Sequence, residues 1–136
     1  MRRTVSIGLV AAALAIGAPA MSTTAASASP DGYKPPPGLR WVGEIIRKDF
    51  MPLGKANFHT AMCVADRESN FDPKAYNPNS GASGVFQFIP STWTVLSEEA
   101  GYGGDSPFKA RPNIGTAAWA VSQPDIGWGP WGGHCP

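Results

Sequence analysis

Charged and metal-binding side chains are scarce in this chain of 136 residues. Only 15% of the residues are charged and the formal net charge is +1, which argues against a surface for nucleic acid. The chain holds two histidines and two cysteines: His59, His134, Cys63 and Cys135. Their spacing matches no zinc-finger pattern, so we expect no metal, no cofactor and no nucleic-acid partner.

No stretch of the sequence alternates apolar and polar residues regularly, so a large β-sheet is not expected. Apolar residues recur instead at three- and four-residue steps, and they predict four helices, over about residues 39–50, 57–69, 91–100 and 113–121. Asn57, Ser91 and Asn113 are the expected N-caps of the last three, and Gly101 is the expected end of the third. The fold class is therefore all-α (mainly α), one small domain with a long C-terminal loop rich in glycine, proline and tryptophan.

One long apolar run, over residues 5–20, lies near the amino terminus. It follows two arginines and precedes the sequence Ala-Ser-Ala at 26–28, the pattern of a cleaved secretory signal peptide over residues 1–28. The run is short for a membrane anchor and is broken by Pro19. We therefore expect a secreted protein, extracellular or cell-wall associated, with no stable membrane insertion after signal cleavage.

Cleavage would leave one domain of modest size and nearly balanced charge. The signal segment carries two arginines and no acid, so Lys and Arg fall from 11 to 9 against 10 Asp and Glu, a net charge of about −1. Residues 29–38 include three successive prolines, which favour an extended linker; a proline-rich ligand for a partner is the alternative. Residues 39–136 are long enough for one core and contain no internal repeat.

The two cysteines, Cys63 and Cys135, both lie in the part expected to be exported. An even number of cysteines in an oxidising compartment favours a disulfide over a thiol nucleophile. The bridge would close a loop of about 73 residues and could stabilise the fold by roughly 4 kcal/mol. It would also tie the predicted helix 57–69 to the loop that follows the last helix.

Residues 67–93, RESNFDPKAYNPNSGASGVFQFIPSTW, carry the pattern that points to chemistry. Glu68 stands at the predicted carboxyl end of an apolar helix, where the helix dipole disfavours an anion. Such a place is poor for a plain surface carboxylate but suits an acid catalyst, and cleavage of a sugar bond needs one to protonate the departing oxygen. The stretch resembles the catalytic core of the soluble lytic transglycosylase family, a lysozyme-like group that acts on peptidoglycan.

The resemblance implies a role for several residues of this stretch. In the family a Glu-Ser pair supplies the catalytic acid and a supporting hydroxyl, which here match Glu68 and Ser69. A Gly-Leu-Met-Gln motif supplies a glutamine at the sugar, and here it reads Gly-Val-Phe-Gln, ending at Gln87. Gln87 would bond an N-acetyl group; the alternative is an amide satisfied by backbone. The family's Ala-Tyr-Asn-Ala-Gly motif is absent, and Gly-Trp-Gly-Pro-Trp at 127–131 stands in its place.

Aromatic side chains are the other expected substrate contacts, because their faces pack against the C–H surfaces of sugars. Trp93 and Trp119 lie on predicted helices and are expected in the core, whereas Trp128 and Trp131 lie in the C-terminal loop and could form a wall of the site. The full set of expected substrate-binding residues is Ser69, Asn77, Phe86, Gln87, Trp128 and Trp131.

The family resemblance implies an enzyme acting on peptidoglycan glycan strands, with residues 39–136 as its catalytic domain, and we expect it to be a monomer. One glutamate would cleave the β-1,4 bond between MurNAc and GlcNAc, acting first as acid and then as base, and would leave a 1,6-anhydromuramyl product. Two alternatives remain: a hydrolytic lysozyme-like muramidase and a non-catalytic glycan-binding module. A two-carboxylate hydrolase would need a second acid, and the candidates are Asp66, Asp72, Asp105 and Asp125.

Overall fold

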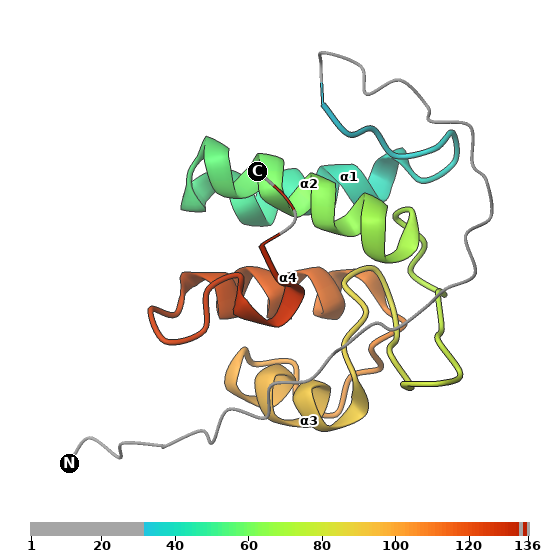
Figure 1. Ribbon diagram of the computed structural model, residues 1–136, viewed down its shortest axis with the longest axis vertical. Helices are drawn as coiled ribbons and strands as arrows, with labels where there is room; N and C mark the ends of the chain where they lie inside the picture. The colour runs from blue at the N-terminus through green and yellow to red at the C-terminus, as the bar shows by residue number, and fades with distance from the viewer. Residues whose placement is uncertain (1–31, 134, 136) are drawn as a thin grey trace.

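The computed structural model describes residues 32–133 and 135 (Figure 1). The predicted signal peptide, residues 1–28, and His134 lie outside the described residues. The elements in chain order are α1 (Arg40–Phe50), η1 (Met51–Leu53), α2 (Lys55–Ser69), α3 (Pro90–Glu99), α4 (Ala110–Ser122) and η2 (Gly129–Trp131), where η marks a 3₁₀ helix. In the described part, β-structure is limited to two isolated bridges, so the mainly helical fold class is confirmed.

The helices begin earlier than the expected caps, and all three cap predictions were wrong. α2 begins at Lys55 because Gly54, with φ of 105°, turns the chain directly before it. α3 begins at Pro90, whose fixed φ suits the first turn of a helix, and not after Ser91. α4 begins at Ala110, so Asn113 lies inside the helix. The predicted end of α3 is confirmed, since Gly101 follows it with φ of 86°.

The core forms where α1 packs against both α2 and α4, and α3 packs on α4 (Figure 1). The loop between α2 and α3 also contributes to this core, and in Figure 1 it lies at the same end of the molecule as the start of α4. Phe86 in that loop stacks on Phe50 of α1, with ring centroids 5.7 Å apart. The largest fully buried aliphatic and aromatic side chains of these elements are Val42, Ile46, Phe50, Val64, Phe71, Val85, Phe86 and Ile114.

The described part of the predicted linker, residues 32–38, is irregular and lies against α1. A Cβ atom at Gly43 would stand 2.6 Å from Cγ of Pro35, so glycine is needed for this close approach. The chain turns into α1 through a hydrogen bond from Leu39 N to Pro36 O of 3.0 Å. These residues therefore cover part of α1 before the first helix begins.

A disulfide joins Cys63, near the middle of α2, to Cys135, beyond η2, with an S–S distance of 2.04 Å. The pairing predicted from the sequence is therefore present. It closes a loop between positions 72 apart and holds the segment after α4 against α2. Across the described part of the chain, no helix is long and apolar enough to cross a membrane.

Candidate active site

The end of α2 makes a sharp turn that fixes where Glu68 and Ser69 stand. Asn70 and Phe71 follow them with φ of 50° and 62°, two successive left-handed residues. Asparagine tolerates this conformation, but phenylalanine rarely does. The Phe71 side chain is fully buried, and its N–H donates to Ala65 O at 3.1 Å, so core packing and the helix cap hold the turn.

Glu68 is held by its neighbour in sequence, Arg67. Nε and Nη2 of Arg67 donate to Oε1 of Glu68 at 3.1 Å and 2.8 Å. Nη2 also donates to the backbone oxygen of Trp131 at 2.6 Å. The Glu68 side chain is 28% exposed, and its Oε2 has no hydrogen-bond partner among residues 32–133 and 135. One carboxylate oxygen is therefore fixed, and the other is open to a ligand.

Ser69 joins the end of α2 to the loop that follows it. Its hydroxyl lies 3.1 Å from Ala65 O and 2.8 Å from Val85 O, and it donates to these carbonyls. The hydroxyl therefore supports the site through the backbone of the loop, and within the described residues it makes no hydrogen bond to Glu68.

Asn113 of α4 holds the loop between α2 and α3 (residues 70–89) through side-chain hydrogen bonds to the loop backbone, and we call this contact the clamp and the loop the clamped loop. Its side chain is fully buried, and Oδ1 accepts the N–H of Phe86 at 2.8 Å. Nδ2 donates to Ser83 O at 3.2 Å and to Pro107 O at 2.9 Å. Sequence reasoning assigned this residue to a cap and missed its role. Pro112 was the available signal, because proline is tolerated in the first turn of a helix and so places the helix start before it.

Gly84 makes room for this clamp. A Cβ atom there would stand 2.2 Å from Pro107 O and 2.3 Å from Nδ2 of Asn113, and its φ is 80°. Both the close approach and the left-handed backbone require glycine at this position. The glycine of the Gly-Val-Phe-Gln motif therefore allows α4 and the loop to meet.

Gln87, the last residue of that motif, has φ of 51° and is half-buried. Its Nε2 donates to Ala75 O at 3.1 Å and to Gly84 O at 3.0 Å. Both amide hydrogens are thus bonded to backbone carbonyls, as expected if the amide of Gln87 is satisfied by the backbone. Its Oε1 has no partner among the described residues and can accept a hydrogen bond from a ligand.

The aromatic residues expected to line the site lie deeper than expected. Trp131 is 8% exposed, and its Nε1 donates to Phe86 O at 2.8 Å. Phe86 is fully buried, so its ring offers no surface to a sugar. Trp128 is half-buried, stacks on Phe50 at 5.6 Å and donates from Nε1 to Oδ1 of Asn57 at 2.9 Å. Only Trp128 of this group keeps substantial accessible surface.

The tryptophans expected in the core lie on α3 and α4, as the sequence indicated. Trp93 is buried, as expected, and its Nε1 donates to Asp105 O at 3.1 Å. Trp119 is half-buried and packs at the edge of the core. The prediction therefore holds fully for Trp93 and in part for Trp119.

None of the four candidate second acids shares a hydrogen bond with Glu68 in the described part of the chain. Asp72 accepts the N–H of Lys74 at 2.8 Å, as a turn residue does. Asp105 pairs with Nζ of Lys109 at 3.1 Å. Asp66 lies two residues before Glu68 on α2, and side chains at that spacing do not face each other. Burial raises the pKa of the Asp66 carboxyl above its ordinary value.

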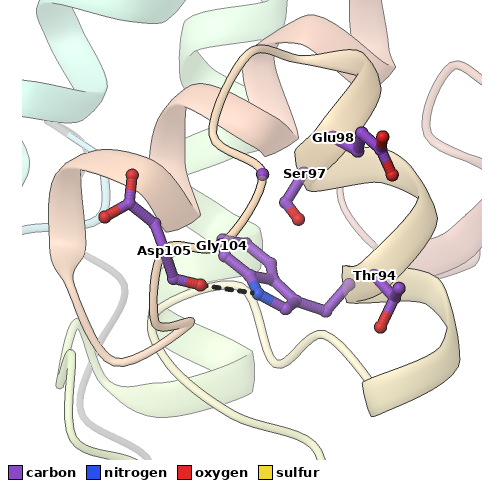
Figure 2. A pocket seen from close by; sticks show the side chains of 7 residues that line it. Thr94, Ser97, Glu98, Gly104 and Asp105 are labelled. Atoms are coloured by element: carbon purple, nitrogen blue, oxygen red, sulfur yellow. Dashed lines mark hydrogen bonds between the residues drawn. The ribbon is translucent and has the colours of Figure 1, made fainter.

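A separate hollow of about 540 Å³ lies along α3 (Figure 2). In Figure 2, Thr94, Ser97 and Glu98 line it from the helix, and Gly104 and Asp105 line it from the following loop. Glu68 and Gln87 do not line it.

Within the described residues, no group of three or more His, Cys, Asp or Glu is placed to hold a metal ion.

Comparison with known proteins agrees with the resemblance seen in the sequence. Residues 55–124, just over half of the chain, match the family described as "Transglycosylase SLT domain". "Probable transglycosylase SceD 3" of Staphylococcus saprophyticus is 46% identical over 55 residues, which are 40% of this chain and 23% of that protein. "Probable transglycosylase SceD" of Staphylococcus aureus strain Newman is 40% identical over 68 residues, 50% of this chain and 29% of that protein.

The matched region therefore spans less than a third of the length of these relatives. No solved structure matches the chain. The family match includes α2 with its Glu-Ser pair, the clamped loop, α3 and the whole of α4. The chain belongs to the transglycosylase SLT domain family.

Proposed function

We propose that this protein is a peptidoglycan lytic transglycosylase that cleaves the β-1,4 bond between MurNAc and GlcNAc, with Glu68 as its only catalytic carboxylate. The observation that carries the proposal is the state of Glu68 at the end of α2. Arg67 holds Oε1, Oε2 is open, and the side chain is only partly exposed. A carboxyl group with one fixed and one free oxygen can exchange a proton with a ligand in a defined direction.

The reaction needs two proton transfers at Oε2 of Glu68. The protonated carboxyl donates its proton to the glycosidic oxygen as the C1–O bond of MurNAc breaks, which releases GlcNAc as an alcohol. The carboxylate then takes the proton of the MurNAc 6-hydroxyl while that oxygen bonds to C1. Glu68 ends protonated, as it began, and no water is consumed, so the product is a 1,6-anhydromuramyl end.

Gln87 and Asn77 are the polar groups proposed to orient the sugar. Oε1 of Gln87 can accept the N–H of an N-acetyl group while Nε2 stays bonded to the loop backbone. Asn77 is exposed, and its Oδ1 accepts Asn79 N at 3.0 Å, which leaves its amide hydrogens for sugar hydroxyls. Ser69 supports this arrangement by fixing Val85 to α2.

The proposal also covers where the protein acts, its oligomeric state and its partner. The pattern of residues 1–28 supports export, and the chain's balanced charge suits a partner held by hydrogen bonds and aromatic faces. We propose a secreted monomer, extracellular or cell-wall associated, that acts on glycan strands and needs no cofactor.

Mass spectrometry of purified peptidoglycan after digestion tests the proposed function. We expect wild-type protein to release fragments that end in 1,6-anhydromuramic acid. Glu68→Gln should lose at least about two orders of magnitude in rate, because general acid–base catalysis contributes on that scale. Glu44→Gln, a change at an exposed glutamate of α1, is the matched control and should keep the wild-type rate.

Two results would overturn the proposal. Fragments with only reducible muramic ends would mean hydrolysis, as in a lysozyme. A wild-type protein that binds peptidoglycan without releasing fragments would be a glycan-binding module.

A further inference from the structure

Two exposed aromatic side chains meet on the surface beside the clamped loop. Tyr76 is 59% exposed and Phe108 is 41% exposed, although both are large and apolar over most of their area. Their ring centroids lie 6.2 Å apart, with the ring planes inclined at 54°. The two residues come from different connections: Tyr76 lies between α2 and α3, and Phe108 lies between α3 and α4. The fold thus brings them together at its surface.

Tyr76 is joined to Gln87 through backbone hydrogen bonds. The Tyr76 backbone pairs with Ser83 in an antiparallel bridge. The neighbouring carbonyl, of Ala75, accepts both Gly84 N at 2.9 Å and Nε2 of Gln87 at 3.1 Å. The residue that carries the exposed ring therefore adjoins the carbonyl that orients the Gln87 amide.

Phe108 is connected to the same loop, between α2 and α3, through Asn113. It follows Pro107, whose carbonyl accepts Nδ2 of Asn113 at 2.9 Å. Asn113 in turn holds Phe86 N at 2.8 Å and Ser83 O at 3.2 Å. One buried amide thus fixes the backbone near both rings, which keeps their relative position without burying either of them.

The geometry points to a sugar-binding platform made by Tyr76 and Phe108, on which one pyranose ring of a glycan strand packs beside Gln87. This inference rests on the proposed function and adds a binding subsite to it. Aromatic faces suit the C–H surface of a pyranose ring, and the tilted pair offers two such faces. Asn77, next to Tyr76 and exposed, can bond hydroxyl groups at the edge of the ring.

The burial of the expected aromatic contacts strengthens this assignment. Trp131 and Phe86 lie in the core and Trp128 is half-buried, so Tyr76 and Phe108 are more exposed than any of the three aromatic residues expected to line the site. The backbone that carries the Tyr76–Phe108 pair is already held by the bridge to Ser83 and by the hydrogen bond from Asn113 to Pro107 O. Binding therefore does not have to order that backbone.

Binding to peptide-free glycan strands, measured in the Glu68→Gln background, tests the platform without turnover. Tyr76→Ala and Phe108→Ala should each weaken binding about three- to tenfold, the scale of a single aromatic contact. Tyr76→Phe keeps the ring and should bind like the parent. Trp41→Ala removes an aromatic side chain of α1 whose exposure, 49%, lies between those of Tyr76 and Phe108, and it is the matched control.

Steady-state kinetics with otherwise wild-type protein provides the second readout. Tyr76→Ala should raise KM by a similar factor, with a smaller change in kcat, because the platform lies beside the reacting bond and not at it. If Tyr76→Ala and Phe108→Ala together bind like the parent and leave KM unchanged, the platform assignment is wrong. Should an alanine variant fail to fold, the pair Tyr76→Phe and Tyr76→Leu still separates an aromatic face from apolar bulk.

The platform and the proposed function fail in different ways. If the wild-type protein binds strands without cleaving them and Tyr76→Ala binds weakly, the platform stands and the transglycosylase proposal falls. If the wild-type protein cleaves strands and the double variant behaves like it, only the platform falls.

Discussion

Two nitrogens of Arg67 donate to the same oxygen of Glu68, Oε1, at 3.1 Å and 2.8 Å. The guanidinium extends this contact to the backbone oxygen of Trp131 at 2.6 Å. The orientation of Glu68 therefore depends, through Arg67, on a residue that lies 64 positions from Arg67 in sequence. A planar guanidinium can serve both partners at once, which a lysine ammonium cannot do with the same geometry.

Arg67→Ala should lower kcat about ten- to hundredfold with a smaller effect on KM, because a misplaced catalytic group costs rate more than binding. Arg67→Lys should recover only part of the loss. Both parameters can be measured by the release of soluble glycan fragments. Arg47→Ala, which removes an exposed arginine paired with Glu44, is the matched control. A wild-type kcat for Arg67→Ala would mean that the ion pair has no positioning role.

Asn113→Ala should lower the free energy of unfolding by about 2–4 kcal/mol, because it leaves two polar backbone groups without a partner. These groups are the N–H of Phe86 and the carbonyl of Pro107, whereas the carbonyl of Ser83 loses one of two hydrogen bonds and keeps the one from Phe88 N at 3.2 Å. Urea unfolding followed by circular dichroism measures the change. Asn79→Ala, at an exposed position, should stay within about 0.5 kcal/mol of wild type. Equal stability of the two variants would contradict the clamp.

Reduction of the Cys63–Cys135 bridge should lower the melting temperature, since the closed loop could account for roughly 4 kcal/mol. It should also loosen the segment that carries Trp131 and so weaken the contact to Arg67. We expect activity to fall at temperatures where the helical signal is still intact. Activity and circular dichroism, recorded together with and without reductant, check this. Free thiols at both positions in protein unfolded without reductant would exclude the bridge.

Asp66 predicts a pH dependence of stability. Burial raises the pKa of its carboxyl above the ordinary 3.8, so the folded protein holds this proton more tightly than the unfolded chain. Its contribution to stability is fully present below about pH 3.8 and is lost as the pH rises through the raised pKa.

Asp66→Asn should therefore raise the melting temperature at pH 7 and leave it nearly unchanged at pH 3. Asp125→Asn, in an exposed loop, is the matched substitution. A lower melting temperature for Asp66→Asn at pH 7 would show that the ionised carboxylate is stabilising, against this expectation.

The hydrophobic periodicity was sufficient to predict the four helices, and the count of cysteines was sufficient to predict the disulfide. Neither was sufficient to predict the contacts that hold the candidate active site. The hydrogen bonds from Arg67 to Trp131 O and from Phe86 N to Asn113 Oδ1 span 64 and 27 residues, and such contacts leave no periodic signal. Asn57 shows the same limit: its amide serves Leu53 and Trp128, so a residue typical of a cap is used in a tertiary contact.

The tryptophans of the C-terminal loop show why loop composition was a poor guide to exposure. Glycine and proline around Trp131 suggested an open loop, yet the ring fills the space between Phe86 and Phe88. Whether such a ring lies in the core depends on which residues, distant in sequence, the fold brings next to it. The exposed partner of Phe108 could not be foreseen for the same reason, since the two rings meet only in the folded chain.

In most binding loops the same residues both hold the shape of the loop and contact the ligand. Here the buried amide of Asn113 holds the shape, which leaves exposed residues of the loop for contact with a ligand. Because the backbone from Ser83 to Phe86 is held by α4, the exposed side chains at positions 76 and 79 do not have to maintain the loop's shape. Diversity at these two positions is therefore compatible with folding, and it can be selected for recognition alone. A library varied at both positions, with Asn113 and Asn77 kept, would test the proposed recognition of glycan strands in a uniformly folded starting population.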